Sequence, residues 1–189
     1  DNVTGSGETD ALEGVYAEIH EDWAWEIALS ATGEPGAVKS VIGSTGETSA
    51  KGVDASGSKD SNTIEIIASK NIVGSDIGKY KYILILGSQD GFGTGKWRDV
   101  DASSKSWRLG GGHDVADDGY NYDSNILDMV LPEGVNQQAL LSSYSVENRE
   151  YVQLTGFHIP SVEQQIYGIS TGVITCLLYT SPSPRDTRE

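Results

Sequence analysis

The sequence predicts an all-β sandwich, and three observations carry this prediction. Short segments in which apolar and polar residues alternate recur along the 189 residues, as half-buried strands require. The 23 glycines fall largely between these segments and supply turns. No long window repeats its apolar residues with a helical period. Strands joined by Gly-rich turns, without regular helices between them, are typical of a β-sandwich.

The first predicted elements form a hairpin. Residues 15–20 and residues 23–30 both alternate with the period of a strand. The short acidic pair Glu21-Asp22 lies between them, so the two strands are expected to pair through a tight turn. Val15, Ala17 and Ile19 are expected to face inward. The second strand is expected to carry Trp23, Trp25, Ile27 and Leu29 on one face.

The middle of the chain contains the strongest strand signal, at residues 80–86, where both faces are mostly apolar. This pattern predicts a central strand that is covered on both sides. Before it, residues 37–42 and 63–68 are expected to be strands. The Gly/Ser/Thr-rich residues 43–59 predict a loop or a weak edge strand, and residues 69–78 have room for one helical turn.

The last predicted elements are short. Residues 126–131 form an apolar strand that ends at Pro132. Residues 137–142 suit one or two helical turns, and residues 151–154 predict a final strand.

The charge of the chain excludes several classes of partner. The formal net charge is −15, from 28 acidic and 13 basic residues. Nucleic acids and anionic membrane surfaces need a basic face, so neither is expected to bind. No apolar run reaches the length of a membrane span. The acidity fits a secreted, calcium-tolerant or salt-adapted protein, and plain solubility is the alternative.

Four regions are predicted along the chain. Residues 1–10 are expected to be a disordered or truncated lead-in, and residues 11–160 to be the β-sandwich domain. Residues 161–175 are expected to be a linker to further sequence downstream.

The fourth region, residues 176–189, is expected to be non-native. It opens with CLLYTSPSPRD, which resembles a translated sequencing adapter at the end of a metagenomic fragment. Cys176 is the single cysteine, so the natural part is predicted to have no disulfide, thiol nucleophile or cysteine metal site. Residues 173–179 are for the same reason not expected to form a strand.

The glycine-rich residues 87–96, GSQDGFGTGK, invite a nucleotide-binding interpretation, which fails on spacing. Asp90 stands where the first glycine of a phosphate loop should be, and Trp97 replaces its hydroxyl residue. No helix is predicted to follow and to offer its N-terminus to a phosphate.

A calcium site is the one cofactor that the residues suggest. Ca²⁺ takes six to eight oxygen ligands, several of them carboxylates on a flexible loop. The spacing of the acids is not that of an EF-hand, and a solvated acidic loop is the alternative. The candidate ligands are Asp114, Asp117, Asp118 and Asp123, with help from Asn121.

Aromatic residues in polar surroundings predict a carbohydrate-binding surface. Tryptophan stacks on the apolar face of a sugar ring, while nearby Asp, Asn and Gln side chains bond the hydroxyl groups. Trp97 and Trp107 lie in Gly-rich polar stretches, although packing in the core is the alternative for each. The candidate carbohydrate-binding residues are Trp97, Trp107, Gln89, Asp90, Trp23 and Trp25.

Catalytic residues cannot be assigned from the sequence. Paired carboxylates could hydrolyse a glycoside, but the separation that matters is spatial. His20, His113 and His158 are scattered and lack metal-ligand spacing. We therefore predict no catalytic residue, and a small glycosidase that uses two loop acids stays open as an alternative.

Several runs together resemble a known family. They are residues 14–19 (GVYAEI) leading to Trp25-Glu26, residues 86–97 (LGSQDGFGTGKW), residues 107–112 (WRLGGG) and residues 125–141 (NILDMVLPEGVNQQALL). This set is similar to the C-terminal domain of glucodextranase and of related secreted amylolytic and pullulanase-type proteins. The resemblance covers most of residues 11–154.

The resemblance implies a fold and a function. The fold would be an immunoglobulin-like or jelly-roll sandwich, DOMON-like and of the family-nine carbohydrate-binding-module type, truncated at its N-terminus because opening strands would precede Asp1. The domain would be a non-catalytic, extracellular or cell-surface module, linked in cis to a glucan-degrading domain. Its partner would be an α-glucan or a cell-envelope polymer. A structural envelope anchor that binds no soluble glycan is the alternative.

Overall fold

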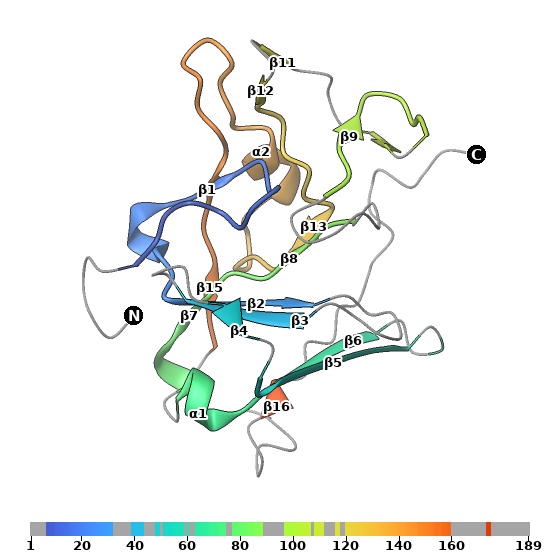
Figure 1. The fold of residues 1–189 in the computed structure, drawn as a ribbon. Coiled ribbons are helices and arrows are strands. Elements are labelled where there is room, and N and C mark those ends of the chain that lie inside the picture. Colours follow the sequence, from blue (N-terminus) through green and yellow to red (C-terminus); the bar gives the residue numbers. More distant parts are fainter. Residues whose placement is uncertain are drawn as a thin grey trace. The chain divides into compact units, whose positions relative to one another are not determined.

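The fold is seen in a computed structural model that describes residues 7–31, 39–43, 48–49, 51–58, 60, 63–74, 77–88, 97–106, 108–111, 116–117, 120–159 and 173–174 (Figure 1). Strands predominate over these residues, helices are few and short, and none of the described sheets closes into a barrel. The predicted all-β fold is confirmed. None of the described helices has the length and apolar character that crossing a membrane requires.

The chain divides into two compact units. Unit 1 comprises Asp1–Gly7, Trp25–Tyr80 and His158–Glu189, and unit 2 comprises Glu8–Ala24 and Lys81–Phe157. Of the predicted regions, the lead-in as far as residue 6 and the read-through at residues 176–189 lie outside the described residues. The predicted linker also lies outside them, apart from residues 173–174.

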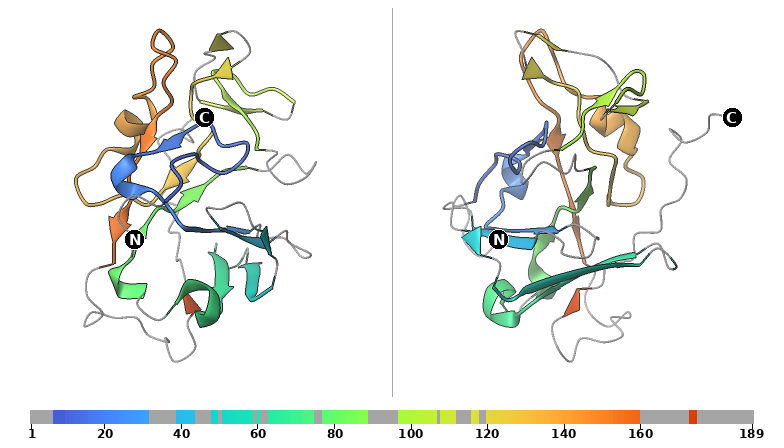
Figure 2. Two further views of the ribbon diagram at one scale, coloured as in Figure 1. Left: turned by 60° about the vertical axis from the view of Figure 1, so that its left-hand side comes forward. Right: turned by 45° about the vertical axis from the view of Figure 1, so that its right-hand side comes forward.

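Unit 1 contains two three-stranded sheets, and strand β3 of the first contacts strand β5 of the second. The first sheet has the order β2-β3-β4 and the second β16-β6-β5, both antiparallel. Figure 2 shows the β5–β6 ribbon from two further sides. The strands are β2 (Ile27–Ala31), β3 (Lys39–Gly43), β4 (Thr48–Ser49), β5 (Val53–Ser58), β6 (Thr63–Ala68) and β16 (Val173–Ile174).

Several local predictions for unit 1 are confirmed. Strand β6 has the predicted bounds, and β5 lies at the edge of its sheet, within residues 43–59 where a loop or a weak edge strand was expected. Val53 and Ala68 face each other across the β5–β6 pair, and both are buried. The predicted helical turn appears as α1 (Lys70–Val73), followed by the 3₁₀ turn η2 (Ile77–Lys79).

Unit 2 is built from pairs of very short strands. Strand β1 pairs in parallel with β14, and β9 in parallel with β10. The other pairs are β8 with β13, β11 with β12, and β7 with β15. The strands are β1 (Glu18–Ile19), β7 (Lys81–Tyr82), β8 (Ile85–Leu86), β9 (Val100–Asp101), β10 (Leu109–Gly110), β11 (Ala116–Asp117), β12 (Tyr120–Asn121), β13 (Asp128–Met129), β14 (Gln153–Leu154) and β15 (Phe157–His158). The helical elements are η1 (Glu21–Trp23) and α2 (Gln137–Leu141).

The main hydrophobic core of the described residues lies in unit 2. The alternation at residues 15–19 places the predicted residues Val15, Ala17 and Ile19 inside, as expected. Val152 and Leu154 are fully buried, while Gln153 between them is exposed. The remaining buried apolar residues of this core are Val100, Tyr122, Ile126, Met129 and Leu141.

One buried amide joins two distant segments of unit 2. The side chain of Asn125 accepts a hydrogen bond from the Tyr16 backbone N–H at 2.9 Å. It also donates one to the Gly14 carbonyl at 2.7 Å. Asn125 is 1% exposed, so these two bonds replace those that water would otherwise make. The amide therefore fixes the start of the chain against the segment that precedes β13.

The predicted N-terminal hairpin is wrong. Trp23 lies in η1 rather than in a strand, and β1 and β2 pair with β14 and β3 instead of with each other. The His20 side chain accepts the Asp22 backbone N–H through Nδ1 at 3.2 Å, which caps a helical turn where a hairpin turn was expected. Ile27, expected to share one strand face with Trp23, Trp25 and Leu29, is 44% exposed.

Two further predictions need correction. The apolar residues 80–86 form two short strands, β7 and β8, because the chain changes partner from β15 to β13 between them. Their apolar side chains are half-buried, and no single strand is covered on both faces. Residues 173–174, not expected to form a strand, pair with β6 as β16, in the register Val173 to Ile67 and Ile174 to Ile66.

Candidate functional site

Trp97 is the candidate sugar-stacking residue whose packing the structure shows. Its indole lies against the backbone of Gly87, at the end of β8, where a Cβ atom would overlap the ring atoms Cζ3 and Cε3. The Arg98 N–H donates to the Ser88 carbonyl at 2.7 Å, which joins the two ends of the loop between them. Trp97 is half-buried. The ring is thus held by packing, as its alternative interpretation required, and keeps a partly exposed surface.

The substitution Gly87→Ala tests the packing of the Trp97 ring against Gly87. The added methyl group must displace the indole, so we expect a loss of about 1–3 kcal/mol in the free energy of unfolding. Urea unfolding of Gly87→Ala, Trp97→Ala and the double variant measures the coupling. We expect the double variant to be no less stable than Trp97→Ala alone. Additive losses would show that the two residues do not compete for space.

Trp23 makes a different set of contacts. The Lys81 ammonium lies 5.8 Å from the centroid of the Trp23 ring, within the range of a cation–π interaction. The same ammonium donates to the Asp22 carbonyl at 2.5 Å, which ties β7 to η1. Trp23 is half-buried. Trp25 is half-buried too and belongs to unit 1.

The remaining predicted site residues are placed only in part. The residues Gln89, Asp90, Trp107, Asp114 and Asp118 lie outside the described residues. Asp117 belongs to β11. Burial raises the pKa of Tyr144, and the charge of the half-buried Asp123 raises it further. Within the described parts of the chain, no group of three or more His, Cys, Asp or Glu side chains could hold a metal ion. Calcium binding stays a prediction.

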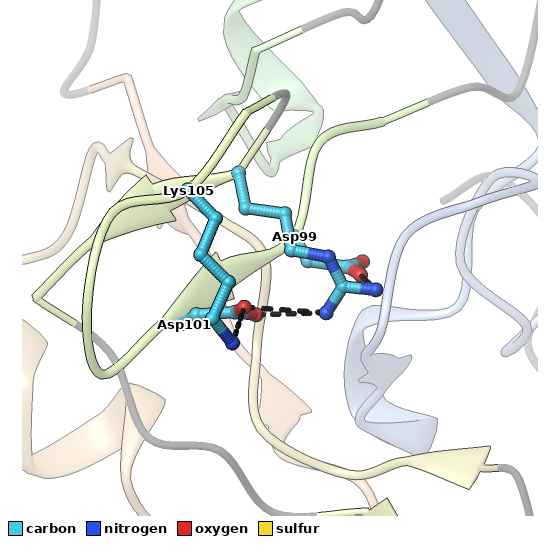
Figure 3. Close-up of polar contacts among 4 residues, drawn as sticks. Asp99, Asp101 and Lys105 are labelled. Atoms are coloured by element: carbon cyan, nitrogen blue, oxygen red, sulfur yellow. Dashed lines mark hydrogen bonds and ion pairs between the residues drawn. The ribbon is translucent and has the colours of Figure 1, made fainter.

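A network of charged side chains lies in unit 2 that the sequence analysis did not single out (Figure 3). Arg108 contacts Asp101 through Nη1 at 3.1 Å and Asp99 through Nη2 at 3.3 Å. Lys105 contacts Asp101 through Nζ at 2.9 Å. The Asp101 side chain is only 6% exposed, so its charge depends on these two cations. We call these four residues the charged network.

The backbone explains why these four side chains meet. Strand β9 runs parallel to β10, and the Leu109 N–H donates to the Asp99 carbonyl at 3.0 Å. Lys105 and Arg108 exchange two backbone hydrogen bonds, so the chain reverses tightly between them. At Gly110 an added Cβ would lie 2.9 Å from the Ser104 nitrogen, so this compact loop needs a residue without a side chain there.

Tyr16 and Asn121 extend the charged network. The Tyr16 hydroxyl lies near the side chains of Asp99 and Asn121, which both influence its pKa. Burial and then the Asp99 charge raise the pKa of Tyr16. Burial alone would raise the pKa of Asp101, but hydrogen bonds from Lys105 and Arg108 outweigh it and lower that pKa.

A comparison with protein families identifies the class of the chain. Residues 1–156 match the family model described as the C-terminal binding module, SLH-like, of glucodextranase. The chain belongs to this family. The resemblance predicted from the sequence is thereby confirmed. No curated protein and no solved structure gave a match.

The charged network of this glucodextranase-type module has a signal in the sequence. Asp99 and Asp101 are two residues apart, and side chains at that spacing share one face of an extended strand. A Lys and an Arg follow within seven residues and could return to neutralise them. The predictions for this stretch rested on its tryptophans and left these charges out.

The network makes the stability of the module depend on pH. The pKa of Asp101 is lower in the folded chain than in the unfolded one, so its ionised form stabilises the fold. This stabilisation is present above the unfolded pKa, about 4, and is lost as the pH falls through the lowered folded value. We expect Asp101→Asn to lower the free energy of unfolding at pH 7 by about 2 kcal/mol.

Urea unfolding at pH values between about 2 and 7 measures this effect. The difference between wild type and Asp101→Asn should shrink as the pH falls below about 4, because the wild-type carboxyl then becomes protonated. Asp60→Asn, at an exposed turn position, is the matched control and should show a much smaller difference. A difference for Asp101→Asn that stays constant across this range would contradict the assignment.

Proposed function

We propose that this chain is a non-catalytic polysaccharide-binding module that acts at the cell surface, in cis with a glucan-active catalytic domain. The observation that carries the proposal is the match of residues 1–156 to the binding module of glucodextranase. The ligand is an α-glucan or another polymer of the cell envelope. The net charge of −15 supports this choice over nucleic acid or an anionic membrane surface.

The chemistry of the candidate residues supports the same proposal. Trp97 keeps part of its ring exposed while Gly87 fixes its position, so stacking on a sugar needs little reordering of the side chain. Trp107, Gln89 and Asp90 are proposed to act with it, through stacking and through hydrogen bonds to hydroxyl groups. Trp23 and Trp25 are the other proposed aromatic contacts.

Affinity electrophoresis in gels that contain starch, dextran or pullulan tests the proposal. We expect at least one polymer to retard the chain relative to a gel without polymer. We also expect no release of reducing sugar from these polymers, because no catalytic residue is proposed. Unretarded migration in all three gels would rule out binding to soluble glucans.

A second candidate function rests on the words of the family description. The module is called SLH-like, which favours attachment to the cell surface. In this version the chain anchors a catalytic domain to the envelope and binds no soluble glucan. Co-sedimentation with isolated cell envelopes separates the two, since an anchor sediments with envelopes and migrates freely in every polymer gel.

A further inference from the structure

We propose that Tyr16, Asp99 and Arg108 bind the hydroxyl groups of an uncharged glycan. The inference rests on the proposed polysaccharide-binding function and locates it on residues that the family match does not assign. These residues come from two distant stretches of unit 2, and Asn121 adds a third. We call Tyr16, Asp99, Arg108 and Asn121 the hydroxyl site.

The side chains of Arg108 and Asp99 are partly exposed to solvent. The Arg108 side chain is 47% exposed although two carboxylates hold it, and the Asp99 side chain is 18% exposed. Asp101, by contrast, is 6% exposed and serves only to hold the cations. A guanidinium has five N–H donors, and the ion pairs with Asp99 and Asp101 engage its two terminal nitrogens. Arg108 therefore keeps donor capacity on a surface that a ligand can reach.

The polar groups of the hydroxyl site suit the hydroxyl groups of a sugar. A carboxylate accepts two hydrogen bonds side by side, and a guanidinium donates two in the same way. Either edge matches a pair of neighbouring hydroxyls on a sugar ring. The Tyr16 hydroxyl lies near both Asp99 and Asn121, and the hydroxyl and the amide each offer a donor and an acceptor.

Arg108 is also pre-organised for binding. Asp101 holds one terminal nitrogen of Arg108 and is itself held by Lys105 at 2.9 Å. The backbone pairing between Lys105 and Arg108 fixes the turn that carries them. Side chains fixed before binding lose little conformational entropy when the ligand arrives, which favours affinity.

The charge balance points to the class of ligand. Asp99 and Asp101 carry two negative charges, and Lys105 and Arg108 carry two positive charges, so the network has no net charge. The chain around it carries −15. An acidic polymer meets no positive field here and is repelled by the rest of the surface. An uncharged polyol loses nothing on either count.

Affinity electrophoresis of single variants of the full chain tests the hydroxyl site. Tyr16→Phe removes a hydroxyl group, Asp99→Asn removes a negative charge, and Arg108→Lys removes the planar set of guanidinium N–H donors. We expect the affinity of each variant to fall by about tenfold or more for whichever of starch, dextran or pullulan retards the wild type. Tyr144→Phe and Arg149→Lys, at the same residue types elsewhere in unit 2, should bind as the wild type does.

Two measurements keep the outcomes distinct. Thermal unfolding shows whether each variant is folded, and Tyr16→Phe, which lacks a single oxygen atom, decides the matter if Arg108→Lys does not fold. Polygalacturonate serves as the acidic comparison polymer and should not retard the wild type. If it retards the wild type more than the neutral polymers do, the inferred ligand class is wrong.

The failure of this inference differs from the failure of the proposed function. Folded variants that migrate like a retarded wild type would overturn the hydroxyl site and leave polysaccharide binding in place. In that case the charged network would stabilise its loop and bind no glycan. A wild type that no neutral polymer retards would overturn the hydroxyl site, and one that also fails to sediment with isolated cell envelopes would overturn the proposed function too.

Discussion

Gly156→Ala is expected to lower the free energy of unfolding by about 3 kcal/mol or more. A Cβ atom at this position would overlap the carbonyl oxygen of Tyr82 and lie 2.7 Å from its carbonyl carbon. It would also lie 2.9 Å from Cγ1 of Ile83. Because two of these atoms belong to the backbone, no side-chain rotation relieves the clash, and the β7–β15 pair must shift. Urea unfolding of the full chain measures the loss.

Gly134→Ala is the matched control for this prediction. Gly134 has a φ of 85°, which disfavours alanine, but an added Cβ would meet no atom within 4 Å. We therefore expect a loss of only about 1 kcal/mol, from backbone strain alone. Equal losses at the two positions would show that the close approach of Gly156 to Tyr82 does not matter.

Asn125→Leu is expected to cost about 3 kcal/mol of the free energy of unfolding. The leucine has a similar size but leaves the Tyr16 N–H and the Gly14 carbonyl without the partners that Asn125 supplies. A buried group that loses its hydrogen bond costs about 1–3 kcal/mol. Unfolding in urea, followed by circular dichroism, measures the change. A variant as stable as the wild type would contradict the role of the amide.

The control for Asn125 is the other asparagine that bonds a backbone N–H. Asn136 caps α2, and its side chain accepts the Ala139 N–H at 2.9 Å. It is exposed and serves a single local bond, so Asn136→Ala should cost only about 1 kcal/mol. The contrast separates a bond within one turn of chain from bonds that join segments 109 and 111 residues apart.

The sequence predicts the local features of this fold well, because they depend on neighbouring residues. The alternation at residues 15–19 correctly buried Val15, Ala17 and Ile19. The apolar alternation at residues 63–68 marked β6 with its observed bounds. Both successes use the two-residue period of a strand, which is a property of the strand itself.

Choices of partner could not be predicted in the same way. Strand β1 pairs with β14, and Glu18 lies opposite Gln153, a separation of 135 residues that no local pattern encodes. The hairpin expected around Glu21-Asp22 failed for this reason, together with the cap from His20. Apolar residues at 80–86 marked a strand but could not show that it changes partner halfway.

The candidate site was predicted unevenly for a related reason. Trp97 was expected to be either exposed or packed, and the structure shows it half-buried, with its ring packed against Gly87. The pairing of Arg108 with Asp99 and Asp101 depends on the tight reversal at Lys105, which charge alone does not specify.

The parallel pairing of β1 with β14 has a consequence for the order in which the chain folds. Unit 2 consists of Glu8–Ala24 and Lys81–Phe157, with most of unit 1 between them. During synthesis, residues 18–19 therefore wait without their strand partner until residues 153–154 have left the ribosome. The β2–β3 and β5–β6 pairs join near neighbours and can form earlier. We expect a chain that stops after Arg149 to be cleaved rapidly by proteases around residue 19, and a chain that stops after Ile159 to resist. Equal resistance of the two chains would contradict this order.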